Sequence, residues 1–409
     1  MEVSRLISIA TDEYNNYLET GELKTLQELQ KEVRLNSSEA RYVKFLRDVF
    51  IEKSASFSTY EDIIHALEVD LKKIKKKLKI QSSGSGRIEF LLKQIESKIK
   101  SSPTLVDTEI ISNGKKTVHP ITQELVFLIS DTHFGENVEL PAPDGNGYIN
   151  KYDIDIAKKR IKSIIEKVEM YTDIHRAYSN IDTLHIAFLG DMVSGYGLHD
   201  DLDMTNGLNI AEQILEGSKI LSAIILRLSK HFKEIKVYGV CGNHGRTQKK
   251  KLYKQPTSSY DYLLYKIVER EVSLIKQIKK LKTDIEFNIA ETSFLVTSIQ
   301  NHTLLFTHGD NIKSWAGIPY YGMMRDYASK QETIISTMDT PINYIVMGHF
   351  HQPITINRPL GGIIVNGSLK GVDEYSLANN WISSPSQTLF ALNKDQGKTF
   401  LYELEPDSE

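Results

Sequence analysis

Five short apolar runs follow one another between Glu124 and the C-terminus, and long helix-like stretches separate them. This alternation of strand-like and helix-like segments predicts an α/β domain. Each run ends directly at a loop that carries polar residues, and the carboxyl ends of strands are where binding sites gather in α/β sheets. The sequence therefore predicts one site, built from the loops that follow these strands. The runs are residues 125–129, 184–189, 235–241, 304–306 and 344–347.

The loops after these runs carry carboxylate, amide and imidazole side chains, and five of the twelve histidines of the chain lie in them. A set of such ligands without a thiolate suits Mn²⁺, Fe or Zn²⁺ better than Mg²⁺, which prefers oxygen ligands and retained waters. We expect divalent metal ions at this site, with manganese as the first choice. In chain order the motifs are Ser130-Asp131-Thr132-His133, Gly190-Asp191, Gly242-Asn243-His244, Thr307-His308-Gly309-Asp310 and Gly348-His349-Phe350-His351.

The composition is typical of a soluble globular protein. The formal net charge is -3 and 40% of the residues are hydrophobic, so the overall charge points neither to a nucleic acid nor to a membrane. Cys241 is the only cysteine, which excludes an intrachain disulfide and a zinc site with several thiolates, and fits a reducing compartment. The N-terminus lacks the pattern of a secretory signal, and no stretch approaches the roughly 18 apolar residues of a membrane span. We expect a cytoplasmic protein with no membrane partner.

The first hundred residues differ from the rest of the chain. At 409 residues the chain exceeds the roughly 250–300 residues at which one hydrophobic core stops growing, so more than one unit is expected. Residues 1–100 are rich in Leu, Glu and Lys at helical spacing, which predicts an all-α region. Residues 101–122 hold prolines and a glycine among polar residues and are predicted to be a linker. The α/β domain would then occupy residues 123–409.

Two features of the first hundred residues suit a nucleic acid partner. Residues 25–33, 34–37 and 38–49 have the pattern of helix, tight turn and helix, which is the order of a helix-turn-helix. The helix predicted at 71–80 carries six lysines, which could neutralise backbone phosphates. The alternatives are ordinary packing of amphipathic helices and a solvated charged face. The sequence leaves both interpretations open.

Taken together, the order D-x-H, G-D, G-N-H, H-G-D and G-H-x-H resembles the calcineurin-like metallophosphoesterase superfamily over roughly 230 residues. The resemblance implies a four-layer sandwich, in which helices flank two mixed β-sheets, and a dinuclear metal centre at the strand ends. It implies that Asp191 bridges the two metals. The other implied ligands are Asp131, His133 and His351 for the first metal, and Asn243, His308 and His349 for the second.

The same resemblance gives His244 the role of general acid, or of electrostatic partner to the leaving oxygen. Two cations about 3.5 to 4 Å apart can lower the pKa of a metal-bound water that attacks phosphorus, and can stabilise both reacting oxygens. The resemblance therefore implies a hydrolase acting on phosphoric esters. The sequence departs from the family pattern at Gly245, where many members carry an acidic residue that steadies the histidine. Asp261 and Asp310 are candidates for that task.

Our first hypothesis is a phosphodiesterase or nuclease acting on DNA or RNA. Nuclease members of the superfamily, including SbcD-type DNA-repair nucleases, share these motifs, and the loop after His244 is basic and could guide a polyanion. The alternative for the loop is a solvated surface loop. The alternatives for the function are a phosphomonoesterase acting on a protein or small metabolite and a non-catalytic metal-binding scaffold. The sequence leaves the oligomeric state open, a homodimer included. The basic residues are Arg246, Lys249, Lys250 and Lys251.

Overall fold

The computed structural model describes residues 121–198, 204–249, 256–313, 319–378 and 382–407, together with short pieces of the first hundred residues, the longest being 23–32. The chain forms two compact units, Met1–Lys115 and Lys116–Glu409. The boundary between the units falls inside the predicted linker, which lies almost entirely outside the described residues. The predicted domain limits therefore stay a prediction.

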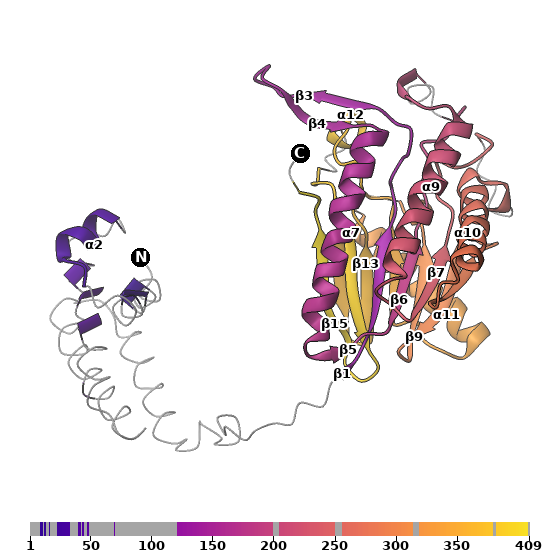
Figure 1. Cartoon of the computed structure of the whole chain (residues 1–409). Helices are drawn as coiled ribbons and strands as arrows, with labels where there is room; N and C mark the ends of the chain where they lie inside the picture. The colour runs from indigo at the N-terminus through magenta and orange to yellow at the C-terminus, as the bar shows by residue number, and fades with distance from the viewer. Residues whose placement is uncertain are drawn as a thin grey trace. The chain divides into compact units, whose positions relative to one another are not determined.

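Within the first unit, the structure describes helix α2 (Leu26–Glu32) (Figure 1). Two reciprocal hydrogen bonds begin it: the Thr25 N–H donates to the Glu28 carboxylate at 2.7 Å, and the Glu28 N–H donates to the Thr25 hydroxyl at 3.4 Å. This is the capping-box arrangement. Half of the predicted second helix, 38–49, is described and is helical, and all of 71–80 lies outside the described residues. The all-α region and its partner therefore stay predictions.

A six-stranded mixed sheet carries one half of the predicted site. Its strand order is β15-β14-β2-β6-β7-β8. Strands β2, β6, β7 and β8 run parallel to one another, and β14 is antiparallel to both β2 and β15. Three of the predicted apolar runs form β2, β6 and β7. The bounds are β2 (Glu124–Ile129), β6 (Thr183–Phe188), β7 (Glu234–Gly239), β8 (Asp284–Ile289), β14 (Gln387–Asn393) and β15 (Gly397–Leu404).

A five-stranded mixed sheet carries the other half, in the order β12-β13-β11-β10-β9. Strands β13, β11 and β10 are parallel, and the edge strands β12 and β9 are antiparallel to their neighbours. The two remaining predicted runs form β10 and β11. The bounds are β9 (Phe294–Ile299), β10 (His302–Thr307), β11 (Tyr344–Met347), β12 (Ile354–Arg358) and β13 (Gly361–Val365).

Two small strand pairs complete the β-structure of the described residues. Strands β1 and β5 pair in parallel, and β3 and β4 form an antiparallel hairpin that projects from the sandwich (Figure 1). The sequence patterns did not predict this hairpin. The bounds are β1 (Ile121–Thr122), β3 (Val138–Pro141), β4 (Tyr148–Tyr152) and β5 (Ser179–Asn180).

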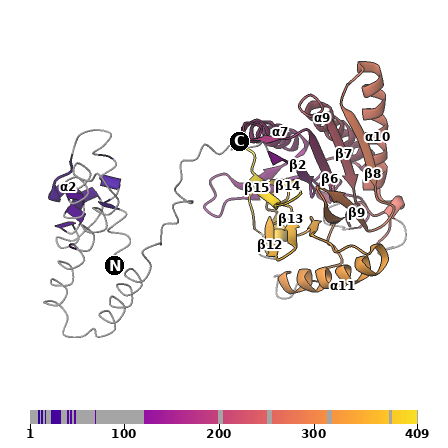
Figure 2. The ribbon, with the colours of Figure 1, turned by 90° about the horizontal axis from the view of Figure 1, so that it is seen from below.

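Four layers form because the central strands are buried on both faces. In β2, Phe127 belongs to the core between the six-stranded sheet and helices α7, α9 and α10, whereas its neighbour Val126 packs between the two sheets. Leu305 of β10 packs toward α11 on the far side of the five-stranded sheet. Figure 2 shows the helices on the outer faces. The predicted fold class, two mixed sheets flanked by helices, is confirmed for this unit. The bounds are α7 (Ile154–Arg176), α9 (Ile210–Leu228), α10 (Tyr260–Lys279), α11 (Tyr320–Met338) and α12 (Glu374–Ala378).

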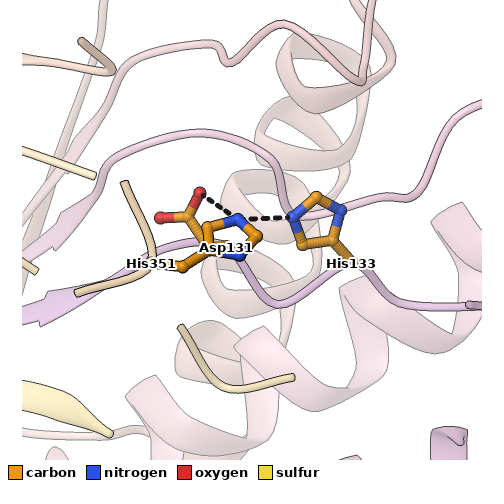
Figure 3. Close-up of side chains that lie close together, drawn as sticks. All are labelled: Asp131, His133 and His351. Carbon is orange, nitrogen blue, oxygen red and sulfur yellow. Dashed lines mark hydrogen bonds and ion pairs between the residues drawn. The ribbon is translucent and has the colours of Figure 1, made fainter. Parts of the chain in front are cut away.

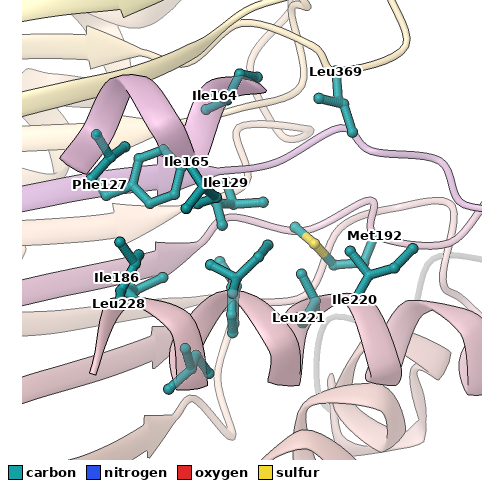
Figure 4. Close-up of a cluster of buried hydrophobic side chains, with 14 of the residues drawn as sticks. Phe127, Ile129, Ile164, Ile165, Ile186, Met192, Ile220, Leu221, Leu228 and Leu369 are labelled. Atoms are coloured by element: carbon teal, nitrogen blue, oxygen red, sulfur yellow. The ribbon is translucent and has the colours of Figure 1, made fainter. Parts of the chain in front are cut away.

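Helices α7 and α9 begin at polar caps and bury apolar stripes. The Asp153 carboxylate accepts the N–H groups of the first turn of α7, and Asn209 and Glu212 form a capping box at the start of α9. Ile165 of α7 and Leu221 of α9 then enter the core shown in Figure 4. Among the helices that the structure describes, none combines the length and apolar character needed to cross a membrane.

We expect Phe127→Ala to lower the free energy of unfolding by about 3–5 kcal/mol, because removing a buried ring leaves a cavity between the sheet and the helices. The ring is 1% exposed. Urea denaturation measures the change. Ile278→Ala on α10 is the control, since that side chain is 71% exposed and its truncation should change the free energy by no more than about 0.5 kcal/mol. Equal losses in the two variants would contradict the assigned core.

Candidate metal centre

The five predicted motifs converge on one place. Strands β2, β6 and β7 are parallel neighbours, and so are β10 and β11, so the loops that follow them leave each sheet at one edge. Their side chains form three groups of candidate ligands. In each group the ligand atoms lie within 4.8 Å of one another, and consecutive groups share a residue. The groups are Asp131, His133 and His351; His133, Asp191 and His244; and Asp191, His308 and His349.

Asp131, His133 and His351 form the first predicted metal position (Figure 3). The Nε2 atoms of His133 and His351 are 3.3 Å apart, and His351 Nε2 lies 3.4 Å from Asp131 Oδ1. Asp131 and His133 are fully buried. Within the described residues, the Nδ1 atoms of both imidazoles are buried without a hydrogen-bond partner. The two Nε2 atoms and the Asp131 carboxylate, clustered in this way, fit a divalent cation, which takes imidazole and carboxylate ligands together.

Asp191, His308, His349 and Asn243 form the second predicted position. His308 Nε2 lies 2.9 Å from Asp191 Oδ2 and 3.2 Å from Asn243 Oδ1. The other ring nitrogen of His308, Nδ1, donates to the carbonyl oxygen of Leu189 at 2.7 Å. Metal-binding histidines are usually oriented by such a contact. The ring of His349 completes the position, with its centroid 5.1 Å from that of His308.

Asp191 belongs to two of the three groups, as the predicted bridging ligand should. Its Oδ1 accepts the main-chain N–H of His244 at 2.7 Å, and its Oδ2 faces His308. The side chain is almost completely buried. A carboxylate whose two oxygens face different neighbours can contact two cations, so the residues present fit a dinuclear centre.

Histidines offset the charge of the buried carboxylates. Burial alone would raise the pKa of Asp191, but His308 and His244 beside it hold that pKa well below its usual value. Burial alone would lower the pKa of His308, but the nearby Asp191 raises it to about 10. Burial and the neighbouring His308 lower the pKa of His349 to about 4. In the metal-free protein, protonated His308 therefore supplies positive charge that a divalent cation would supply when bound.

Five of the predicted ligands lie on left-handed backbone. This conformation costs a residue with a Cβ roughly 1–2 kcal/mol, and it persists only where the surrounding structure imposes it, often at functional sites. Gly190 precedes one of these ligands, and a Cβ there would lie 2.4 Å from the backbone nitrogen of Gly242. The sheet edges thus hold the ligand loops in a strained form. The φ angles are 51° at Asp131, 44° at His133, 51° at Asp191, 72° at His349 and 57° at His351.

Asp261, at the start of α10, holds two of these loops together. Its buried carboxylate accepts the main-chain N–H groups of Asp191 and Met192 at 3.1 Å and that of Gly242 at 2.9 Å. The same residue explains Gly245, because a Cβ there would lie 2.9 Å from Asp261 Cγ. The departure from the family pattern at Gly245 therefore makes room for Asp261. Asp261 acts on the backbone that carries the ligands.

His244, the predicted catalytic residue, lies half-buried at the edge of the cluster. Its ring is edge-on to that of His133, with the centroids 4.6 Å apart and the planes at 89°. Its Nδ1 lies 3.3 Å from the carbonyl oxygen of Ser194. Gly195 lies so close to His244 that a Cβ there would be 2.2 Å from the His244 carbonyl oxygen. The histidine is thus fixed beside ligands of both predicted metal positions.

The structure describes two of the four predicted substrate-binding residues. Arg246 is half-buried, and its Nε donates to the carbonyl oxygen of Asn243 at 2.7 Å. Lys249 is exposed. Lys250 and Lys251 lie outside the described residues. Arg246 is therefore anchored on a loop that carries a predicted metal ligand, and the role of all four residues in substrate binding stays a prediction.

The sequence did not single out the loop after β13, which supports the site. Ser368 Oγ donates to the carbonyl oxygen of Asp131 at 2.9 Å, and buried Lys370 pairs with Glu136 and Asp373. The signal that could have found this loop is the polar Asn366-Gly367-Ser368, which follows an apolar strand in the same way as the predicted motifs do.

A cavity of about 840 Å³ lies beside the site, at the base of the β3–β4 hairpin. Its wall includes five acidic residues as well as Lys151. A wall of this charge would repel a polyanion and attract cationic groups. The acidic residues are Glu136, Glu139, Asp153, Asp373 and Glu374.

No protein-family model and no curated protein matches the sequence. Similar solved structures include a predicted phosphoesterase from Streptococcus pneumoniae, with 11% identity, a TM-score of 0.27 and coverage of 69% of this chain and 98% of that one. An archaeal phosphodiesterase has 11% identity and a TM-score of 0.31, with coverage of 68% and 99%. Vps29 from Entamoeba histolytica, complexed with Zn²⁺, has 11% identity and a TM-score of 0.29, with coverage of 69% and 99%.

These identities and TM-scores are low, and neither the fold nor the site geometry described above depends on them. The chain's own features agree with the resemblance to calcineurin-like metallophosphoesterases: the order of the motifs, their position at the strand ends and the two-sheet sandwich. A nearer relation to SbcD-type nucleases stays a prediction.

We expect metal binding to release a proton from His308, because its pKa of about 10 keeps it protonated in the metal-free protein and a metal ligand must be a neutral imidazole. Calorimetric titration with Mn²⁺ in buffers of different ionisation enthalpy measures this. At pH 8, where ordinary histidines are neutral, about one proton per chain should be released. The number should fall as the pH passes about 10. In His308→Gln it should vanish, and equal release from wild type and variant would contradict the assignment.

Proposed function

We propose that this chain is a metal-dependent phosphoester hydrolase that cleaves phosphodiester bonds of DNA or RNA. The observation that supports the proposal is the pair of ligand groups connected through the buried carboxylate of Asp191. Two divalent cations held side by side supply an activated water and neutralise the charge of a phosphoryl group. Carboxylate, amide and imidazole ligands suit manganese, iron or zinc, and manganese is our first choice.

In this proposal His244 donates a proton or a hydrogen bond to the leaving oxygen. Its main-chain N–H binds Asp191 and its ring lies against His133, so its position relative to both ligand groups is fixed. Because it is half-buried at the edge of the cluster, it can meet a substrate that enters from solvent. A fixed general acid of this kind contributes about 10²–10⁴-fold to a rate.

The distribution of charge around the site supports a nucleic acid substrate. Arg246 and Lys249 continue the chain from His244, and cationic side chains at such a place would contact backbone phosphates. The cavity at the base of the hairpin is acidic. We therefore expect a nucleic acid strand to approach the metal centre over the basic loop and to avoid the acidic cavity at the β3–β4 hairpin. A cytoplasmic location, with access to such a substrate, is part of the proposal.

We expect His244→Ala to lower kcat for bis-p-nitrophenyl phosphate by about 10²–10⁴-fold, because the leaving oxygen loses its donor while the ligands remain. Metal content measured by elemental analysis should stay at two ions per chain. His231→Ala is the matched control, since His231 pairs with Glu169 away from the cluster. Full activity in His244→Ala would remove the assigned role. Bound metal without turnover of bis-p-nitrophenyl phosphate or of p-nitrophenyl phosphate in the wild type would favour the non-catalytic alternative.

We expect Lys249→Gln to weaken binding of single-stranded DNA several-fold and to reduce the slope of log K against log salt by about one unit, because one phosphate contact is lost. Fluorescence anisotropy at several salt concentrations measures both. Turnover of bis-p-nitrophenyl phosphate should not change. The control is Lys233→Gln, which lies before the amino end of β7 and pairs with Asp182. Turnover of p-nitrophenyl phosphate alone, without diester or DNA cleavage, would favour a phosphomonoesterase.

A further inference from the structure

We propose that Glu136 is a positioning residue that fixes the ring orientation and tautomer of His133, and that Lys370 holds Glu136 in place for this purpose. The inference rests on the proposed metal centre. It concerns residues that the five motifs do not include.

The two ring nitrogens of His133 face different partners. Nε2 faces the ligand cluster, 3.3 Å from His351 Nε2. Nδ1 faces the other way and lies 3.7 Å from Glu136 Oε2. Within the described residues this Nδ1 is buried without a hydrogen-bond partner, and Glu136 is 2% exposed. A carboxylate behind the distal nitrogen of a metal-binding imidazole keeps the proton there and leaves the other nitrogen for the metal.

Lys370 fixes the position of that carboxylate. Its ammonium group lies 2.9 Å and 3.1 Å from the two oxygens of Glu136 and 2.5 Å from Asp373 Oδ2. Asp373 is itself fixed, because its Oδ1 accepts the N–H of Ser376 at 2.7 Å. All three charged side chains are at least nine-tenths buried. Glu136 is therefore held from behind and has little freedom to turn away from His133.

Lys370 contacts two carboxylates, and the buried guanidinium of Arg160 contacts the carbonyl oxygen of Lys370 at 2.8 Å. The charges of these four buried groups balance. Of the four, Glu136 is the one that faces His133, so the Nδ1 atom of His133 meets a carboxylate. A carboxylate at this place suits an imidazole that donates through Nδ1 and binds a cation through Nε2.

The same loop also fixes Asp131, so two of the three predicted ligands of the first position depend on it. Ser368 Oγ donates to the Asp131 carbonyl oxygen at 2.9 Å. The carbonyl oxygen of Lys370 accepts from Arg160 Nη1 at 2.8 Å and from Asn150 Nδ2 at 2.9 Å. These contacts tie the loop to α7 and to β4. The loop that holds Glu136 therefore also holds the ligand Asp131, and α7 and β4 fix the position of this loop.

The test compares Glu136→Gln with Asp373→Asn in the full chain. Each variant removes one carboxylate charge from Lys370, but only Glu136 faces His133. Calorimetric titration with Mn²⁺ should show that Glu136→Gln lowers the binding affinity for one of the two ions by about 10–100-fold. The affinity for the other ion should not change. Asp373→Asn should change both affinities by less than about threefold, well under that range. Equal weakening in both variants would show a purely structural role and overturn the proposal.

The tautomer of His133 gives a second readout that needs no metal. In ¹⁵N spectra of the metal-free wild type we expect His133 to be protonated at Nδ1, and in Glu136→Gln we expect a mixture of tautomers. A wild-type proton on Nε2 would overturn the proposal even if the variant fails to fold. If the wild type binds no metal while the Nδ1 tautomer is present, the proposed metal centre fails and the role of Glu136 survives.

Discussion

The site depends on one buried carboxylate, that of Asp191, and on how completely its surroundings bind it. One oxygen accepts the N–H of His244, the other faces His308, and the residue's own N–H donates to Asp261. Burying a carboxylate costs several kcal/mol unless such partners are present. Each of these partners comes from a different strand end or helix start. The packing of the sandwich brings these partners together and so allows the carboxylate to be buried. Only in this buried position can two ligand groups share it.

The strands and the ligands were predictable from sequence for connected physical reasons. A strand buried on both faces must be apolar throughout, so runs such as residues 125–129 are visible without an alternating pattern. Parallel neighbours place their carboxyl ends at one edge, so polar motifs after such runs must meet in space. His133 and His351 are distant in the chain and follow strands of different sheets, yet their ring nitrogens lie 3.3 Å apart because the two sheets pack with these edges together. The same reasoning could not place the first hundred residues, whose helical spacing does not specify a partner.

What the sequence did not reveal are contacts without a local pattern. Glu136 and Lys370 are separated by 234 positions and neither belongs to a ligand motif, so only the folded chain brings them together. Gly245 looked like a missing acidic residue, but the close approach of Asp261 explains it, and that approach depends on how α10 packs. The β3–β4 hairpin escaped prediction because short strands with exposed residues such as Tyr148 lack an apolar run.

Each predicted metal position takes ligands from both sheets. Asp131 and His133 follow a strand of the six-stranded sheet and His351 follows one of the five-stranded sheet, and Asp191 and His308 are divided in the same way. The apolar layer between the sheets, which includes Val126 and Phe306, sets the distance across which these ligands meet. A cation at either position would therefore connect the two sheets. Sliding of one sheet over the other would separate its ligands and cost its binding energy. The apolar residues between the sheets and the metal ligands at their edge thus stabilise the same alignment of the sheets.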